Sequence, residues 1–174
     1  ADEWLVSLLR RSIRLGVLRD EAPIAVVHGA ITDTAGLAKF SIASRGRAAN
    51  YLTHSGGGSQ TGGKREELLV VTTTIDLLAA HTRRPSVLKI DLEGAELLAL
   101  RGADCVLTRD RPIILCEIGE ENANEVAALL AAHDFVLYDA DGLAEPLTPI
   151  ERPAFNTIAC PRERISAFSA LRAP

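Results

Sequence analysis

The stretch V-L-K-I-D-L-E-G-A-E-L-L-A-L-R-G most constrains the fold of this chain, because it joins a short apolar strand to an amphipathic helix. The run Val87–Ile90 is apolar apart from one lysine, Gly94 permits a tight turn, and the leucines that follow supply a helical apolar face. Asp91 and Glu93 therefore fall at the carboxyl end of a strand, where ligands bind in open α/β sheets. The pattern predicts two acids that face a ligand cleft from the end of a central parallel strand.

A purely structural interpretation of these acids stays open beside the functional one. Acidic side chains are favoured in the first turn of a helix because they interact with the helix dipole. Glu93 and Glu96 would then stabilise the helix start without touching a ligand, and spacing alone does not separate the two interpretations.

The rest of the chain alternates between strand and helix patterns. Helices are predicted over residues 2–18, 74–80 and 121–132, and strands over residues 24–27, 37–42, 113–118, 135–138 and 155–160. Strands that alternate with helices predict an α/β fold with a three-layer, mostly parallel sheet, and the final strand is expected to return antiparallel. We expect a single domain over residues 1–174, with the first helix packed on the core.

Residues 45–65 are polar and rich in glycine, and they lack a sustained apolar period. This composition predicts a flexible loop, which would be either a lid over a bound substrate or plain disorder. The segment Gly58–Lys64 matches the phosphate-binding pattern G-x-x-x-x-G-K, but that loop requires a preceding strand, a following helix and a Ser or Thr after the lysine. Arg65 takes that last position, so a nucleotide triphosphatase is not favoured.

Composition excludes several classes of function. The formal net charge of −4 argues against a nucleic-acid-binding surface, and no apolar run approaches the length of about 20 residues that spans a bilayer. Three cysteines without a C-x-x-C pattern indicate neither a disulfide framework nor a cysteine zinc site. We therefore expect a soluble protein of the reducing cytoplasm, without a nucleic-acid or membrane partner.

The motif V-L-K-I-D-L-E-G-A-E-L-L-A-L-R-G-A, followed by R-P-I-I-L-C-E-I, resembles the FkbM family of S-adenosylmethionine-dependent methyltransferases. The likeness extends to V-V-H-G-A-I-T-D-T-A-G, V-T-T-T-I-D-L-L and F-N-T-I-A-C-P, and it covers most of residues 4–161. It implies a class I, Rossmann-like methyltransferase fold in which the strands ending at Asp91 and Glu117 are the fourth and fifth. It also implies that the N-terminal strands of that fold, with the glycine-rich turn that holds the cofactor, are missing from this chain.

The resemblance implies roles for particular residues. Asp91 is the first candidate and Glu93 the second for a catalytic carboxylate, which would accept the proton of a hydroxyl acceptor or stabilise the cationic sulfonium of S-adenosylmethionine. His28, Gly29 and Ala30 are expected on the adenine side of the cofactor, with Asp91 as a further cofactor contact.

Glu117 and His54 are the candidate substrate-binding residues, the first at the end of the neighbouring strand and the second in the glycine-rich loop. Carboxylates at Asp91, Glu93 and Glu117 would also suit a divalent metal, since hard cations prefer oxygen ligands, but we expect no metal site. The predicted reaction is methyl transfer from S-adenosylmethionine to a small acceptor, a hydroxyl of a sugar or secondary metabolite.

Two other functions stay open. One is a non-catalytic interaction module derived from a methyltransferase fold, which the missing glycine-rich turn favours. The other is a nicotinamide-dependent reductase, which is weaker because no G-x-G-x-x-G follows a predicted strand.

Overall fold

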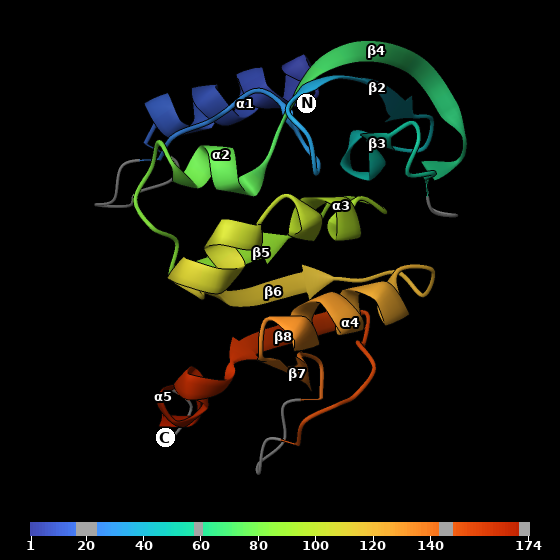
Figure 1. Cartoon of the computed structure of the whole chain (residues 1–174). Helices are drawn as coiled ribbons and strands as arrows, with labels where there is room; N and C mark the ends of the chain where they lie inside the picture. Colours follow the sequence, from blue (N-terminus) through green and yellow to red (C-terminus); the bar gives the residue numbers. More distant parts are fainter. Residues whose placement is uncertain (17–23, 58–60, 143–147, 171–174) are drawn as a thin grey trace.

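The computed structural model describes residues 1–16, 24–57, 61–142 and 148–170, and it has a mixed α/β architecture. Figure 1 shows one sheet together with α1 at one end of the molecule, a second sheet at the other end, and α2 and α3 between them. The helices are α1 (Glu3–Arg14), α2 (Ile75–Ala79), α3 (Glu96–Arg101), α4 (Ala123–Ala132) and α5 (Ile165–Ala170). Short helical turns cover Arg47–Ala49 (η1), Val106–Asp110 (η3) and Arg162–Arg164 (η4).

The first sheet is built around a long antiparallel pair. Its strands are β1 (Ala30–Ile31), β2 (Gly36–Ala43), β3 (Tyr51–Leu52) and β4 (Lys64–Thr73), in the order β1-β4-β2-β3. Strand β2 pairs antiparallel with β4 from Gly36 opposite Thr72 to Ala43 opposite Lys64, whereas β1 pairs parallel with β4. This sheet is therefore mixed.

The second sheet contains the sequence motif. Its strands are β5 (Val87–Ile90), β6 (Ile113–Glu117), β7 (Phe135–Asp139) and β8 (Asn156–Pro161), in the order β5-β6-β8-β7. Strands β5 and β6 are parallel, and β8 runs antiparallel to both β6 and β7. Three strands therefore share one direction, and the expected antiparallel last strand is confirmed.

The expectation of one largely parallel sheet is corrected by this arrangement. The described strands form two separate mixed sheets, and β5 is a terminal strand of its sheet instead of a central one. The difference has a physical cause, because hydrophobic patterning indicates which segments are extended but does not specify which strand edges pair. The local antiparallel pairing of β2 with β4 dominates the first sheet.

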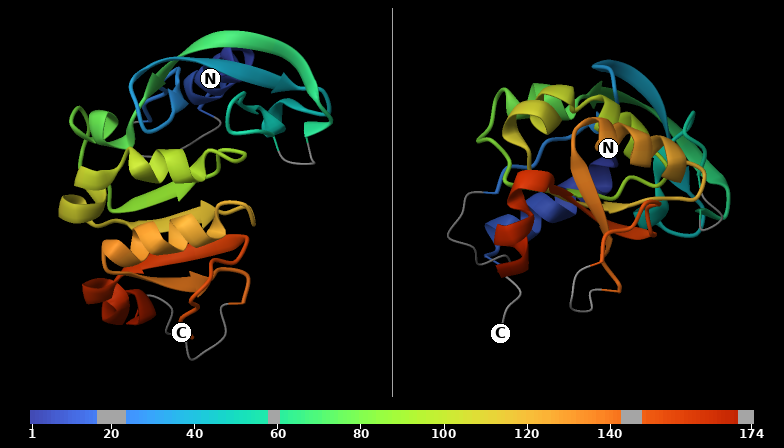
Figure 2. Two further views of the ribbon diagram at one scale, coloured as in Figure 1. Left: turned by 45° about the vertical axis from the view of Figure 1, so that its right-hand side comes forward. Right: turned by 60° about the horizontal axis from the view of Figure 1, so that its bottom comes forward.

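Helices α3 and α4 cover one face of the second sheet, and α5 packs on the opposite face at β7 and β8, where the Phe168 ring lies 6.1 Å from the buried Tyr138 ring. The expected three layers are therefore present only in part. Figure 2 shows α3 and α4 on the same side of these strands. Their buried side chains pack with those from alternate strand positions, because successive strand residues point to opposite faces. The members of this core include Ile90, Leu97, Leu100, Val106, Leu107, Ile114, Cys116, Val126 and Leu130. On the other face, Leu115 and Ile158 are only half-buried, and Val87 is exposed.

The N-terminal helix also differs from its expectation. Helix α1 has no buried residue, and Trp4 on it and Leu15 just after it are largely exposed, so it does not pack on the core as expected. The predicted strand over residues 24–27 is wrong, since these residues have no regular structure and the Val26 carbonyl accepts a hydrogen bond from Arg10 of α1.

The glycine-rich segment has more order than predicted. Within residues 45–65, η1, β3 and the start of β4 are regular, while residues 58–60, part of the glycine-lysine pattern, lie outside the described residues. Its ends are held by backbone bonds, since the Arg45 amide donates to the Thr61 carbonyl and the Ser44 amide donates to the Gly63 carbonyl. These bonds explain why a segment without apolar periodicity is nevertheless ordered.

Candidate functional site

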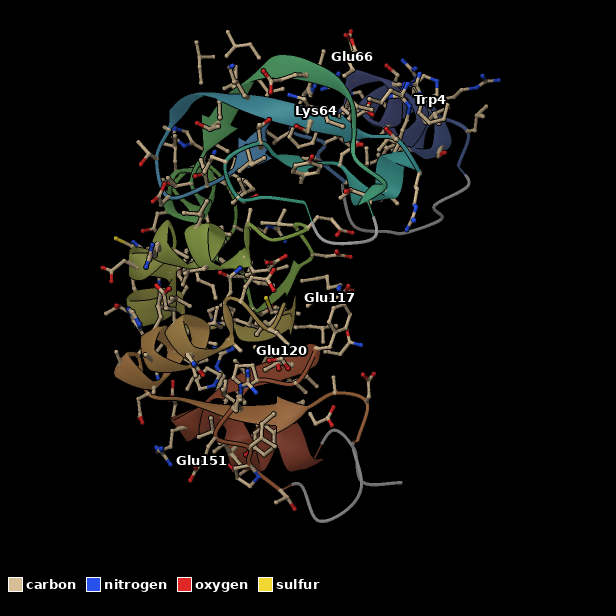
Figure 3. All side chains as sticks on the ribbon, turned by 90° about the vertical axis from the view of Figure 1, so that its right-hand side faces the viewer. Trp4, Lys64, Glu66, Glu117, Glu120 and Glu151 are labelled. Atoms are coloured by element: carbon tan, nitrogen blue, oxygen red, sulfur yellow. The ribbon has the colours of Figure 1, made fainter. Side chains whose placement is uncertain are left out.

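The parallel pairing of β5 with β6 brings two of the predicted acids to the same sheet edge. The register places Ile90 opposite Cys116, so Asp91 and Glu117 occupy the next step at the carboxyl ends of the two strands. In Figure 3, Glu117 projects at mid-height in the molecule, away from Lys64 and Glu66 of the first sheet. Sequence reasoning anticipated this juxtaposition.

Lys89 joins these acids, and sequence reasoning missed this role. Its Nζ lies 2.6 Å from Glu117 Oε1 and 3.6 Å from Asp91 Oδ2. The Glu117 carboxylate, through this hydrogen bond, raises the pKa of the Lys89 ammonium, which therefore stays charged. A signal was present in the sequence, because residues two apart on a strand share a face, and Lys89 precedes Asp91 by that interval.

Glu93 differs from its two acidic neighbours. Its carboxylate makes no hydrogen bond or ion pair with a described residue, and its backbone is left-handed with φ of 48°. Burial raises the pKa of the Glu93 carboxyl, and the negative charges of Asp91, Glu96 and Glu117 raise it further. Glu93 therefore takes up a proton more readily than an ordinary glutamate does.

Glu96 supports the turn that carries Glu93. This residue starts α3, is only 3% exposed, and its Oε1 accepts hydrogen bonds from the Gly94 amide at 3.0 Å and the Leu92 amide at 3.3 Å. Its other oxygen, Oε2, is buried without a hydrogen-bond partner among the described residues. Glu96 therefore lies in the first turn of a helix, as the structural interpretation expected, but its hydrogen bonds are with the turn that precedes the helix.

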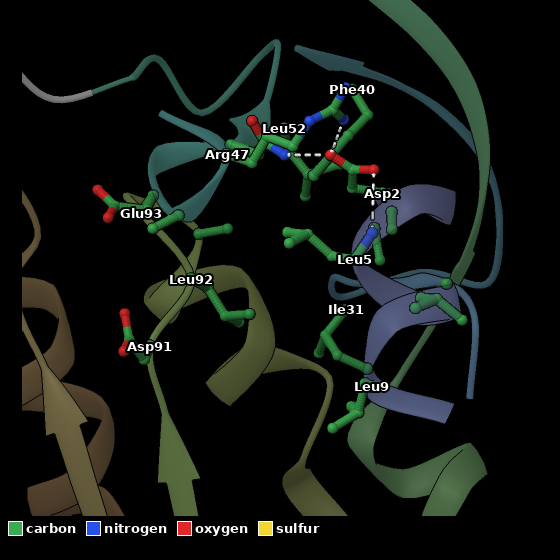
Figure 4. Close-up of a pocket in the computed structure, with 17 residues that line it drawn as sticks. Asp2, Leu5, Leu9, Ile31, Phe40, Arg47, Leu52, Asp91, Leu92 and Glu93 are labelled. Atoms are coloured by element: carbon green, nitrogen blue, oxygen red, sulfur yellow. Dashed lines mark hydrogen bonds and ion pairs between the residues drawn. The ribbon is translucent and has the colours of Figure 1, made fainter. Parts of the chain in front are cut away.

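A cavity of about 290 Å³ lies next to this turn. Figure 4 shows Leu92 directed toward Leu5, Leu9 and Ile31, while the carboxylates of Asp91 and Glu93 leave the backbone on the other side. The walls are mainly apolar, with a polar end formed by the buried Asp2. Its lining residues include Leu5, Leu9, Gly29, Ala30, Asp91, Leu92 and Glu93. Asp91 and Glu93 thus border the cavity, but their carboxylates point away from it, which corrects the expectation that both acids face a ligand cleft.

Both oxygens of the Asp2 carboxylate, at the polar end of the cavity, have hydrogen-bond partners within the protein. Asp2 Oδ1 accepts from the Trp4 and Leu5 amides, and its Oδ2 accepts from the Arg47 guanidinium and from Asn50. These partners lower the pKa of the Asp2 carboxyl below its ordinary value despite burial. Asp2 is accordingly a charged structural group at the start of α1.

The three residues expected on the adenine side separate into two groups. Gly29 and Ala30 line the same cavity as Asp91, in agreement with the expected neighbourhood. His28 does not line it, because its Nε2 lies 2.8 Å from the Ala1 carbonyl oxygen and the residue lines a second cavity, of about 320 Å³, beside β4. The structure thus brings Gly29 and Ala30, but not the His28 side chain, to the acids.

His54 is also separated from the acids. It is exposed and borders a depression with residues of β2 and of the turn before it. The backbone that follows His54 does reach the acidic turn, since a Cβ placed on Gly94 would meet the Gly56 carbonyl oxygen at 3.0 Å. The glycine-rich segment therefore packs on the turn through its backbone, which residue-type arguments did not indicate.

The cluster does not have the character of a metal site. Within the described ranges, no group of three or more His, Cys, Asp or Glu side chains is arranged to hold a metal ion. The positive charge between Asp91 and Glu117 is instead the Lys89 ammonium. Burial raises the pKa of the nearby Cys116 thiol, which therefore stays protonated and is a poor nucleophile.

The arrangement combines three carboxylates with one ammonium beside an apolar cavity. A net negative cluster beside the cavity attracts a cationic ligand group, and the apolar walls suit a flat ring. A volume of about 290 Å³ is at the lower end of the range for small-molecule pockets. The geometry suits binding of a small organic cation and proton transfer at a carboxylate.

The comparisons with known proteins point to a family. Residues 2–137 match the family model described as the methyltransferase FkbM domain. No curated protein and no solved structure matches the chain significantly. No helix among the described residues has the length and apolar character that crossing a membrane requires.

Proposed function

Because this chain belongs to the methyltransferase FkbM family, we propose that it transfers the methyl group of S-adenosylmethionine to a hydroxyl group of a small acceptor, a sugar or secondary metabolite. The observation that carries this proposal is the family match over residues 2–137. The acid cluster at the carboxyl ends of β5 and β6 supports it, since ligands of open α/β sheets bind there.

The residues at the cavity fit this cofactor in part. Gly29 and Ala30 would contact it through their backbone, and Leu92 would contact its apolar ring. The negative charge of Asp91, beside the cavity, would attract its positive charge. When bound, S-adenosylmethionine supplies an activated methyl group on a sulfonium that is a good leaving group. The chain then has to align the acceptor oxygen with that methyl group and exclude water.

The contacts suggest a division of roles among the acids. Lys89 pairs with both Asp91 and Glu117, which leaves these two as charged groups for binding. Glu93 has no such partner and has a raised pKa, which suits it to accept the proton of an acceptor hydroxyl. The proposed order therefore places Glu93 before Asp91 as the base, whereas the sequence favoured Asp91.

Binding and transfer are tested separately. Calorimetric titration of the full-length protein with S-adenosylmethionine should show binding, and Asp91→Asn should weaken it. Transfer of a labelled methyl group to a panel of sugars and hydroxylated metabolites should fall by a factor of about 10² to 10⁴ in Glu93→Gln, the usual contribution of a general base, with binding retained. Glu66→Gln, at an exposed position on β4, is the control.

Absence of S-adenosylmethionine binding by the full-length protein would overturn the proposal. The alternative, a non-catalytic interaction module on a methyltransferase fold, would then remain. Binding with no loss of transfer in Glu93→Gln would instead remove Glu93 from the mechanism and leave the enzyme assignment intact.

A further inference from the structure

Glu96 has a buried carboxylate next to the proposed site, and this carboxylate takes no part in the proposed reaction. Glu96 is 3% exposed, and burial of a charged group is unfavourable unless its hydrogen bonds repay the loss of water. One of its oxygens is fully used and the other has no partner among the described residues. A side chain of this kind requires an explanation beyond helix formation.

The contacts of Glu96 centre on one residue. Its Oε1 accepts from the amides of Leu92 and Gly94, which are the residues immediately before and after Glu93. Glu93 lies between them with φ of 48°, and Gly94 follows with φ of 94°. Non-glycine residues avoid the left-handed region, so the two hydrogen bonds hold Glu93 in a conformation that it would otherwise leave.

The same turn is held from its other sides. Asn122, just before α4, donates from Nδ2 to the Gly94 carbonyl at 3.3 Å. The Gly56 carbonyl lies so close that a Cβ on Gly94 would meet it at 3.0 Å. Glu96 is the charged member of this set of supports, and it is the one that contacts both amides beside Glu93.

We propose that Glu96 is a positioning residue, which fixes the backbone on both sides of Glu93 and so sets the direction in which the Glu93 carboxylate leaves the turn beside the cavity. This inference rests on the proposed function of Glu93 and extends it to a residue that does not line the cavity. Glu96 does not touch the reacting groups and acts through the turn.

The charge of Glu96 gives the proposal a second, separable consequence. Charged groups surround Glu93 from several elements: Asp91 in the same turn, Glu117 on β6 and Glu96 on α3. The Lys89 ammonium of β5 is paired with Asp91 and Glu117, and Arg47 across the cavity is paired with Asp2. Removal of the Glu96 charge should therefore lower the pKa of the Glu93 carboxyl, because one of the negative charges that raise it is lost.

Two variants separate the effect of the Glu96 hydrogen bonds from the effect of its charge. Glu96→Gln keeps an oxygen that accepts both amides but removes the charge, whereas Glu96→Ala removes both. By NMR, Glu96→Gln should shift the Glu93 titration midpoint to lower pH while the Leu92 and Gly94 amides remain protected from hydrogen exchange. Glu96→Ala should also lose that protection. Glu66→Gln on β4 is the matched charge control and should change neither measurement.

An unchanged Glu93 midpoint in Glu96→Gln, or rapid exchange of both amides in the wild-type protein, would overturn the proposal. The wild-type exchange measurement remains decisive if Glu96→Ala fails to fold. Neither measurement requires S-adenosylmethionine, so failure of the proposed function and failure of this inference are distinguishable. If the protein is active, the pH profile of methyl transfer should shift to lower pH in Glu96→Gln together with the Glu93 midpoint.

Discussion

At the scale of single residues, the turn after β5 concentrates unfavourable features. Glu93 has a left-handed backbone, which costs a non-glycine residue about 1 to 2 kcal/mol. Its carboxylate is also partly desolvated and surrounded by three other acids, while the one ammonium of the cluster is paired with Asp91 and Glu117. Such local strain is typical of residues retained for function rather than for stability.

The raised pKa of Glu93 predicts how stability depends on pH. Between the ordinary carboxyl value of 4.5 and the raised value, the folded protein holds a proton that the unfolded chain has released. The stability that this proton contributes is complete below 4.5 and is lost as pH rises through the raised pKa. Glu93→Gln should therefore melt at a higher temperature than the wild type at neutral pH, and this advantage should shrink toward pH 4. Thermal melts across this range check the prediction, and a difference that is constant with pH would contradict it.

At the scale of elements, one acid links α2 to a distant helical segment. Asp76 on α2 accepts hydrogen bonds from the Cys105 and Val106 amides, both at 2.9 Å, at the start of η3. These amides belong to the first turn of a helical segment, where backbone donors lack partners within the helix. Asp76 therefore acts as a helix cap supplied by another element.

Removal of this cap should be costly. Asp76→Ala leaves the two amides without their acceptor, and we expect a loss of about 1 to 3 kcal/mol in the free energy of unfolding. Asp76→Asn, which keeps one acceptor oxygen, should lose less. Urea denaturation measures both changes, and equal stability of Asp76→Ala and the wild type would show that solvent replaces the cap.

Much of the element order was predictable from sequence, for local reasons. The strands that became β2, β5, β6, β7 and β8 and the helices α2 and α4 follow from apolar periodicity and turn residues. The assembly of the strands into two sheets was not predictable from sequence, because the pairing of strand edges depends on contacts between distant segments. Residues 24–27 have the apolar character of a strand but interact with α1 instead.

The candidate site was predictable to a similar extent. Parallel pairing of two strands brought Asp91 and Glu117 together as expected, since both acids end their strands. The roles of Lys89 and Glu96 were missed, because each depends on a side chain that reaches across a turn or to a neighbouring strand. The positions of His28 and His54 away from the acids depend on tertiary packing.

At the scale of the whole molecule, one side chain connects two hydrophobic cores. The core of the first sheet includes Phe40, Ile42 and Val70, and that of the second is centred on α3, α4 and β6. Leu92 packs against both cores from the turn between Asp91 and Glu93. The turn that carries the acids is thus also a joint between the two sheets.

This position predicts a distinctive effect of Leu92→Ala. Truncation of a leucine in a core costs about 2 to 5 kcal/mol, and a partly buried site should be at the lower end. Hydrogen exchange should show earlier opening at β2 and β4 than at β6 and β8, since the second sheet retains the larger core. Leu77→Ala, at an exposed position on α2, is the control. A uniform increase in exchange across both sheets would contradict the role of Leu92 as a joint.

The terminal position of β5 has a consequence for handling the protein. Along Val87–Ile90, the backbone edge opposite β6 has no hydrogen-bonded strand among the described residues, so it offers a template to which another extended chain can attach. Lys89 supplies the one charge within that strand, and charged side chains oppose such growth. We expect Lys89→Val to promote self-association, which light scattering against concentration would detect, so the ammonium that organises the acids would also protect the isolated chain from aggregation.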